Sequence, residues 1–201
     1  MSGITNVRKL HKNDNFKRVG ELLYQVDPFI CPDFFGDKER AREIAPIIYE
    51  EGGLFDTKHT FVSEKNGELI GILVYADNTI KPWEKTKLEL KLRRRGIKIP
   101  ENFDRANKLY MKAVTKDAMK LPDGACEVEL CSIESKVRGE GHGQKIFDVF
   151  LAKTHYKEYH LTVLRDNPIA IHVYEKKGFR IVEKTTGYPD TSVKTYKMIR
   201  K

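Results

Sequence analysis

A glycine-rich string late in the chain has the residue types of a phosphate-binding loop. It consists of Arg138, Gly139, Glu140, Gly141, His142, Gly143 and Gln144. Three glycines at alternate positions let the backbone turn sharply and approach a ligand closely. The helix expected over Gly141–Thr154 would add free N–H groups and the positive end of its dipole. The string therefore predicts an anion site suited to a pyrophosphate.

Two other phosphate-binding motifs do not fit this string. The sequence Gly-x-x-x-x-Gly-Lys-Ser/Thr of nucleotide-binding loops occurs nowhere in the chain. The dinucleotide pattern Gly-x-Gly-x-x-Gly lacks its third glycine, because Gln144 or Ile146 stands at that place. A glycine-rich turn that binds no ligand stays open as the alternative to a cofactor site.

Two carboxylates on the strand before the loop could move protons. The strand expected over Cys126–Ile133 alternates, so Glu127, Glu129 and Cys131 should share one face, opposite Val128, Leu130 and Ser132. Two acids on one face of a central strand are unusual, because burying an unpaired carboxylate is costly. The alternatives are a cross-strand lysine partner or a sheet edge that faces water.

Two motifs in this order resemble the GNAT family of N-acetyltransferases. The string Arg138-x-x-Gly141-x-Gly143 is similar to the family's Arg/Gln-x-x-Gly-x-Gly/Ala sequence. A second block is similar to its Asn-x-x-Ala-x-x-x-Tyr-x-Lys-x-Gly-Phe sequence, and consists of Asn167, Ala170, Tyr174, Lys176, Gly178 and Phe179. The resemblance covers Cys126–Lys201 and, in element order, Ile4–Ala76. It does not cover Asp77–Asp123, which is longer than the usual link in that family.

The resemblance implies an enzyme that moves an acetyl group from acetyl-CoA to an amine by direct attack. Backbone N–H groups from Arg138 through Gln144 would hold the coenzyme A pyrophosphate. Main-chain groups near Cys131 and Ile133 would pair with the pantetheine arm as a strand does, and the N–H of Ile133 would be the oxyanion donor. Asn167 would bind the pantetheine or the phosphate side, with a plain helix cap as the alternative.

The resemblance also assigns two proton transfers. An acceptor amine of pKa ~10 must lose a proton before it attacks, and the departing thiolate must gain one. Tyr174 stands at the family's general-acid position, and a phenol of pKa ~10 can donate at neutral pH. A packing tyrosine is the alternative. Glu127 resembles the base position of histone-type members, with Glu129 as the second candidate and a water relay as the alternative.

The elements that must position these residues follow from periodicity and turn residues. Strands are expected over Ile4–Leu10, His59–Ser63, Glu68–Ala76, Cys126–Ile133, Tyr159–Leu164, Phe179–Thr185 and Val193–Ile199. Helices are expected over Asn13–Val26, Asp37–Glu51, Gly141–Thr154 and Asn167–Lys177, and near Trp83–Arg95 and Asn102–Lys120. Asp27–Gly36 is expected to be an aromatic loop, and Asn66-Gly67 a hairpin turn.

These elements predict one α/β domain over residues 1–201, with a mixed sheet and helices on both faces. By the resemblance, the sheet is GNAT-like and mostly antiparallel. Residues 77–123 would be a charged helical insert between its third and fourth strands.

Composition and charge limit the class of protein. The chain has 201 residues, of which 40% are hydrophobic and 33% charged, as in soluble globular proteins. Its cysteines, Cys31, Cys126 and Cys131, have no metal-ligand spacing, so we expect reduced thiols and no metal. No apolar run is long enough to span a bilayer, and Met1–Leu10 lacks the apolar core of a signal peptide. We therefore expect a cytoplasmic protein without a membrane partner.

The partners are less well defined. A net charge of +8 suits a polyanion, either nucleic acid or a phosphate-rich cofactor. The densest basic run, Lys87–Lys98, has no interleaved aromatics, which argues against specific nucleic-acid binding. An amine-bearing small molecule and a protein amino group both stay open as acceptors, and so does a homodimer. The alternative function is a coenzyme A-binding sensor or interaction module without catalysis.

Overall fold

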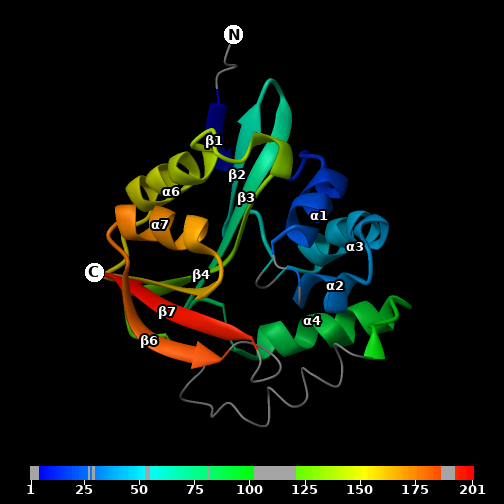
Figure 1. Ribbon diagram of the computed structural model, residues 1–201. Coiled ribbons are helices and arrows are strands. Elements are labelled where there is room, and N and C mark those ends of the chain that lie inside the picture. The colour runs from blue at the N-terminus through cyan, green and yellow to red at the C-terminus, as the bar shows by residue number, and fades with distance from the viewer. Residues whose placement is uncertain are drawn as a thin grey trace.

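The computed structural model describes residues 5–26, 28, 30–52, 55–80, 82–101, 121–186 and 193–201. Within these ranges, seven strands form one sheet in the order β1-β2-β3-β4-β5-β7-β6 (Figure 1). The strands are β1 (Thr5–Lys9), β2 (Thr60–Lys65), β3 (Glu68–Asp77), β4 (Ala125–Ile133), β5 (Glu158–Leu164), β6 (Arg180–Thr186) and β7 (Lys194–Arg200). Among the strands that the structure describes, only β4 and β5 run parallel, and the other neighbours pair antiparallel.

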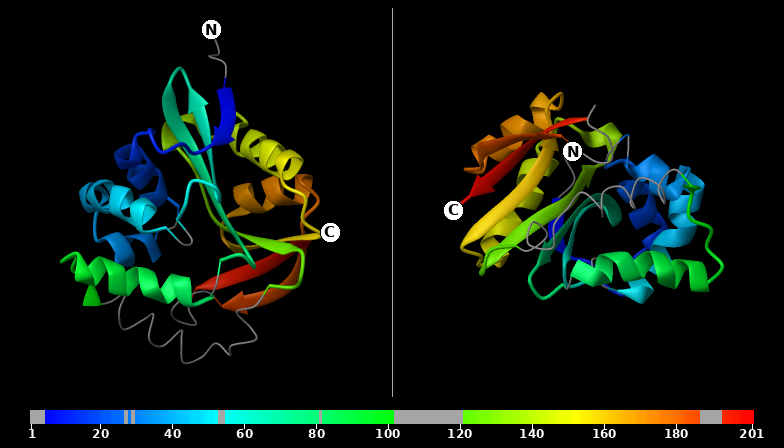
Figure 2. Two further views of the ribbon diagram at one scale, coloured as in Figure 1. Left: turned by 180° about the vertical axis from the view of Figure 1, so that it is seen from behind. Right: turned by 90° about the horizontal axis from the view of Figure 1, so that it is seen from below.

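Helices cover both faces of this sheet (Figures 1 and 2). The helices on one face are α6 (His142–Lys153) and α7 (Pro168–Lys176); those on the other are α1 (Phe16–Tyr24), α2 (Ile30–Phe35) and α3 (Lys38–Glu51). Each face has its own apolar core, and β3 supplies both because its side chains alternate. Ile72 and Val74 pack under α1 and α3, whereas Leu73 and Tyr75 pack with α6.

The expected fold class is confirmed: the sheet is mixed, mostly antiparallel and flanked by helices on both faces. A helix also lies in the insert between the third and fourth strands, as α4 (Pro82–Arg94). The second helix expected there, Asn102–Lys120, lies outside the described residues.

The hairpin between β2 and β3 forms where its turn residues predict it. Asn66 has a φ of 54° and Gly67 a φ of 81°, so both central residues adopt the left-handed conformation. This geometry belongs to the two-residue turn whose twist matches that of its strands. The prediction for Asn66-Gly67 is therefore confirmed.

The aromatic loop expected over Asp27–Gly36 is wrong in part, because Ile30–Phe35 forms α2. Cys31 and Phe35 are buried in the core under α1 and α3, and their four-residue spacing places them on one helical face. Pro32 stands in the first turn of α2, where a missing N–H removes no helical hydrogen bond. Burial of this short apolar face outweighs the proline that suggests a loop.

Candidate functional site

Strands β4 and β5 separate halfway along their length. Their parallel register runs from Ala125, opposite Glu158, to Val128, opposite Leu161. Strand β4 then continues to Ile133, while β5 continues its pairing with β7. One edge of β4 beyond Val128 is thus not covered by β5.

A β-bulge in β4 lies where the two strands part. Tyr75 of β3 is opposite Val128, but Val74 is opposite Leu130, so Glu129 is the additional residue. A bulge bends its strand and increases the local twist, which suits the divergence from β5. It also interrupts the alternation of side chains along β4.

The expectation that Glu127, Glu129 and Cys131 share one face of β4 is therefore wrong. Val128 and Cys131 pack in the same core, that of α6, although strict alternation would separate them. Because Glu129 is an additional residue in the strand, every side chain after it faces the side opposite to the one that strict alternation predicts. Leu130 packs in the other core, under α1.

Backbone groups of β4 point into the space that β5 leaves. The N–H of Glu134 donates to the carbonyl of Ile70 over 2.8 Å. Hydrogen-bonded and non-bonded positions alternate along an antiparallel ladder, so Ser132 bonds to β3 whereas Cys131 and Ile133 direct their main-chain groups away from it. The N–H groups of Cys131 and Ile133 accordingly face the open side of β4, as a strand-like ligand would require.

The carbonyl of Ile133 already has a partner within the chain. It accepts a hydrogen bond of 2.9 Å from Nε of Arg138. The Arg138 side chain thus folds back onto the end of β4 and stabilises the path from the strand into the glycine string. The backbone of Arg138 still forms the start of the glycine string.

The glycine string forms an open turn ahead of α6. Gly139 and Gly141 have φ angles of 86° and 84°, which side chains other than glycine rarely tolerate. A Cβ atom added to either would meet no protein atom within 4 Å, so the backbone there is accessible. Helix α6 begins at His142, and the first N–H groups of a helix, here those of His142, Gly143 and Gln144, have no partner within it. These residues fit a pyrophosphate.

The one acid in the string is paired with bases. Glu140 lies 2.8 Å from Nζ of Lys65 and 3.2 Å from Nε2 of His142. The hydrogen bond from Lys65, and then that from His142, lowers the pKa of Glu140. His142 is buried and also contacts the Thr5 hydroxyl at 3.3 Å. The charge of Glu140, which would repel a phosphate, is thus partly offset by Lys65 of β2.

Tyr174 lies beside the open stretch of β4. Its ring packs against Phe147 and Phe179, with centroids 5.1 and 6.1 Å away. Burial raises the pKa of Tyr174 above its ordinary value, and the nearby Cys131 adds to this effect. The phenol is therefore protonated over the whole neutral range. The structure brings Tyr174 and Cys131 together.

The thiol of Cys131 is poorly suited to act as a nucleophile. Burial raises the pKa of Cys131 to about 12, and the thiolate is the reactive form of a cysteine. This argues against a covalent intermediate on Cys131.

Glu127 lies on the face of the sheet opposite α6 and α7. In register it stands between Ala76 of β3 and His160 of β5. His160 is 4% exposed, and its Nε2 lies 3.1 Å from a carboxylate oxygen of Glu158. Sequence reasoning missed His160, although the alternation of Tyr159, His160 and Leu161 could have placed it on the face of Glu127.

Asn167 is the N-terminal cap of α7. Its side-chain oxygen accepts a hydrogen bond of 3.1 Å from the N–H of Ala170, and Pro168 follows at the first helical position. The capping interaction is therefore present. A contact between Asn167 and a ligand stays a prediction.

The basic run of the insert contributes to packing between helices. Arg95 pairs with Glu50 and Glu51 of α3 at 2.9 and 2.5 Å, and Lys91 pairs with Glu51 at 3.5 Å. These bases thus hold α4 and the residue after its end against α3.

In the part of the chain that the structure describes, no group of His, Cys, Asp or Glu is arranged to hold a metal ion. No helix among those same residues is long and apolar enough to cross a membrane.

Comparison with solved structures shows the fold. An N-acetyltransferase from Staphylococcus aureus Mu50 superimposes with a TM-score of 0.68 at 14% identity, covering 96% of this chain and 99% of that one. A structure described as an acetyltransferase gives 0.66 at 17% identity, covering 98% of each chain. A GNAT family acetyltransferase from Elizabethkingia anophelis with acetyl-CoA bound gives 0.55 at 14% identity, covering 98% and 97%.

No family model matches the sequence, and no curated protein does. The structural matches nevertheless establish that this chain has the fold of the GNAT acetyltransferases, as its two motifs suggested. At these identities the likeness extends to the fold alone.

Proposed function

We propose that the protein is an N-acyltransferase that moves an acetyl group from acetyl-CoA to an amine by direct attack. The observation that carries the proposal is the open edge of β4, which leads through one short 3-10 helix, Ser135–Val137, into the glycine string at the start of α6. The edge offers main-chain partners to an extended arm, and the string offers N–H donors to a pyrophosphate. Coenzyme A combines these two parts in one molecule.

We assign a group of this chain to each step of the transfer. Acetyl-CoA supplies an activated acyl group, and an amine supplies the attacking nitrogen. We assign the base to Glu127, which lies six residues before Ile133 on β4, at most roughly 20 Å along the strand, so the amine's proton reaches it through a chain of waters. The N–H of Ile133 stabilises the negative charge that gathers on the thioester oxygen. Tyr174 donates its proton to the departing thiolate, so that free coenzyme A leaves as a thiol.

The acceptor we propose is an amine on a small molecule or a protein. Most amines are cations at neutral pH, and a carboxylate at Glu127 attracts a cation as well as accepting its proton. This pairing of charges supports an amine over a neutral alcohol, but does not distinguish one amine from another.

A second candidate function is coenzyme A binding without catalysis. The observation that favours it is the packing of Tyr174 between Phe147 and Phe179, which gives this residue a sufficient structural role. A protein of this kind would keep the loop and the open strand edge, and would use them for sensing or for interaction.

A panel of amines with acetyl-CoA separates these functions. We expect release of free coenzyme A thiol that depends on one class of amine, together with acetylated product by mass spectrometry. Tight binding of acetyl-CoA without release for any small amine or peptide amine would favour the sensor. Failure to bind acetyl-CoA would exclude both functions.

A further inference from the structure

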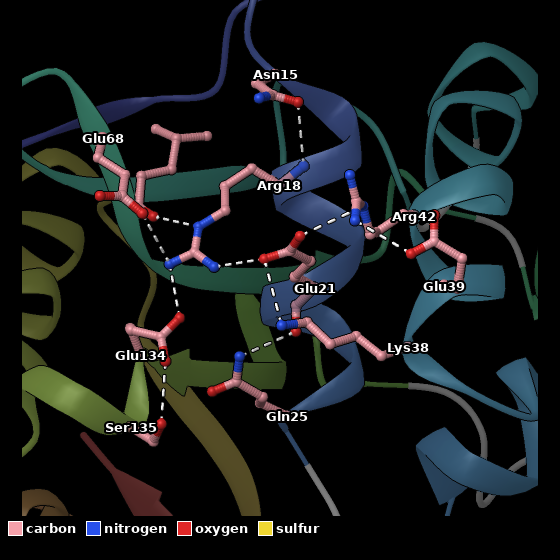
Figure 3. Close-up of polar contacts among 11 residues, drawn as sticks. Asn15, Arg18, Glu21, Gln25, Lys38, Glu39, Arg42, Glu68, Glu134 and Ser135 are labelled. Carbon is pink, nitrogen blue, oxygen red and sulfur yellow. Dashed lines mark hydrogen bonds and ion pairs between the residues drawn. The ribbon is translucent and has the colours of Figure 1, made fainter.

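The residue that follows β4 is held by a charged network. Glu134 comes directly after Ile133, and one of its carboxylate oxygens lies 2.6 Å from Nη2 of Arg18 in α1 (Figure 3). The other accepts a hydrogen bond of 3.0 Å from the hydroxyl of Ser135. The Glu134 side chain is 14% exposed, so the ion pair is largely shielded from water.

All three guanidinium nitrogens of Arg18 have partners. Nε donates to the carbonyl of Leu69 over 2.9 Å, and Nη1 donates to Glu21 over 2.6 Å. Nη2 contacts Glu134 and also lies 3.4 Å from Glu68. Figure 3 shows these partners converging on Arg18 from α1, from β3 and from the end of β4. One side chain thus fixes three elements relative to one another.

These contacts converge on one peptide of β4. The carbonyl of Ile133 is held by Arg138, and the N–H of Glu134 is held by Ile70. The Glu134 side chain is held by Arg18 in turn. The N–H of Ile133 belongs to the preceding planar peptide unit, so it points opposite to the Ser132 carbonyl, which faces β3. The anchors on the next peptide limit rotation about Ile133. The N–H of Ile133 faces the open side of β4.

We propose that Arg18 and Glu134 form a positioning pair that aims the N–H of Ile133 at the thioester oxygen. The inference rests on the proposed function, since it assigns a target to that N–H. Neither side chain touches substrate; both act through the backbone of β4. A shielded ion pair adds little net stability compared with apolar residues, so a role in fixing geometry accounts better for its presence here. Donors that need no reorganisation during the reaction are the most effective.

The test is a spectroscopic one that needs no acceptor. Acetyl-CoA labelled with ¹³C at the acetyl carbonyl is bound to the wild-type protein, and its carbonyl stretch is recorded by isotope-edited infrared spectroscopy. A hydrogen bond to the carbonyl oxygen lowers this frequency relative to the free thioester. We expect Arg18→Met and Glu134→Gln each to lose about half of the lowering or more, while affinity for acetyl-CoA stays within about twofold.

A matched control is available in the same fold. Arg8 of β1 also pairs with two carboxylates, Asp14 and Glu64, both at 2.7 Å. Arg8→Met therefore removes a comparable ion pair that does not contact β4, and it should leave the carbonyl frequency unchanged. The double variant Arg18→Met/Glu134→Gln should be no worse than the worse single variant, because both changes break one interaction.

Each outcome decides the proposal. A carbonyl frequency that stays as in the wild type in both single variants overturns it, even if turnover falls. If Arg18→Met does not fold, Arg18→Lys keeps the charge but not the planar fork, and it must still lose part of the lowering. If labelled acetyl-CoA does not bind the wild-type protein, the proposed function fails first and this inference falls with it.

Discussion

At the scale of single residues, the proposed reaction depends on which side chains carry protons. Burial keeps Tyr174 protonated by raising its pKa, which suits a donor to a thiolate. Glu127 lies on the opposite face of the sheet, in the stretch where β4 still pairs with β5, so the proposed acid and base lie on different faces.

Replacing Tyr174 by phenylalanine removes one proton donor and little packing. We expect Tyr174→Phe to lower turnover at saturating amine by roughly 10²–10⁴-fold, with acetyl-CoA affinity nearly intact. Because its raised pKa keeps the phenol protonated, the wild type should show no loss of activity from this group as pH rises to about 10. A decrease in turnover of only a few-fold would assign Tyr174 to packing instead.

Glu127→Gln keeps the size of the side chain and removes its basicity. We expect turnover to fall near neutral pH and to recover partly at high pH, where free amine is abundant, as a pH–rate profile would record. Glu129→Gln serves as the matched control and should do less. If both variants keep the wild-type pH–rate profile, neither carboxylate is the base. Water would then deprotonate the amine, or the amine molecules that are already neutral in solution would react.

At the scale of elements, β4 shows what the sequence can and cannot predict. Its position as a strand follows from its pattern, and the turn at Asn66-Gly67 follows from residues that tolerate positive φ. The bulge at Glu129 could not be predicted from the sequence, because it arises from the pairing of β4 with β3 and not from local propensity. The role of Glu134 was likewise hidden, since its partner Arg18 is distant in sequence.

The ion pair of Glu134 predicts an effect of acid on stability. Burial by itself raises the pKa of Glu134, but hydrogen bonds from Arg18 and Ser135 overcome it and bring the pKa to about 2, against an ordinary 4.5. A carboxyl whose pKa is lowered by folding stabilises the protein at any pH above its pKa in the unfolded state. This contribution is lost as the pH falls through its pKa in the folded state. The window therefore runs from about pH 4.5 down to about pH 2.

Denaturant unfolding of the wild type and of Glu134→Gln at several pH values measures this contribution. We expect the variant to be less stable by about 1–2 kcal/mol at pH 7 after allowance for solvent screening. The difference should shrink through the stated window, where the wild-type carboxyl becomes protonated. A difference that is independent of pH would show that the change acts through packing and not through charge.

At the scale of the whole molecule, the fold brings distant segments to one site. The open edge belongs to the middle of the sheet, the glycine string to the start of α6, and Arg18 to α1, which packs on the other face of the sheet. The fold class could be predicted because each element has a clear period, and the open turn ahead of α6 because its glycines permit positive φ. The acceptor substrate could not be predicted from the sequence, because no single segment contains the residues that would bind it.

Calorimetric titration of acetyl-CoA into the wild type and Gly141→Asp tests the central claim most directly. Gly141 has a φ of 84° at the start of α6, so an aspartate there adds both strain and a negative charge where we place the pyrophosphate. Gly96→Asp, at a φ of 75° after α4 and with no atom within 4 Å of the added Cβ, controls for backbone strain. We predict that the wild type and Gly96→Asp bind acetyl-CoA and that folded Gly141→Asp does not. Equal affinity in all three would contradict the assignment of the glycine string as the coenzyme A cradle.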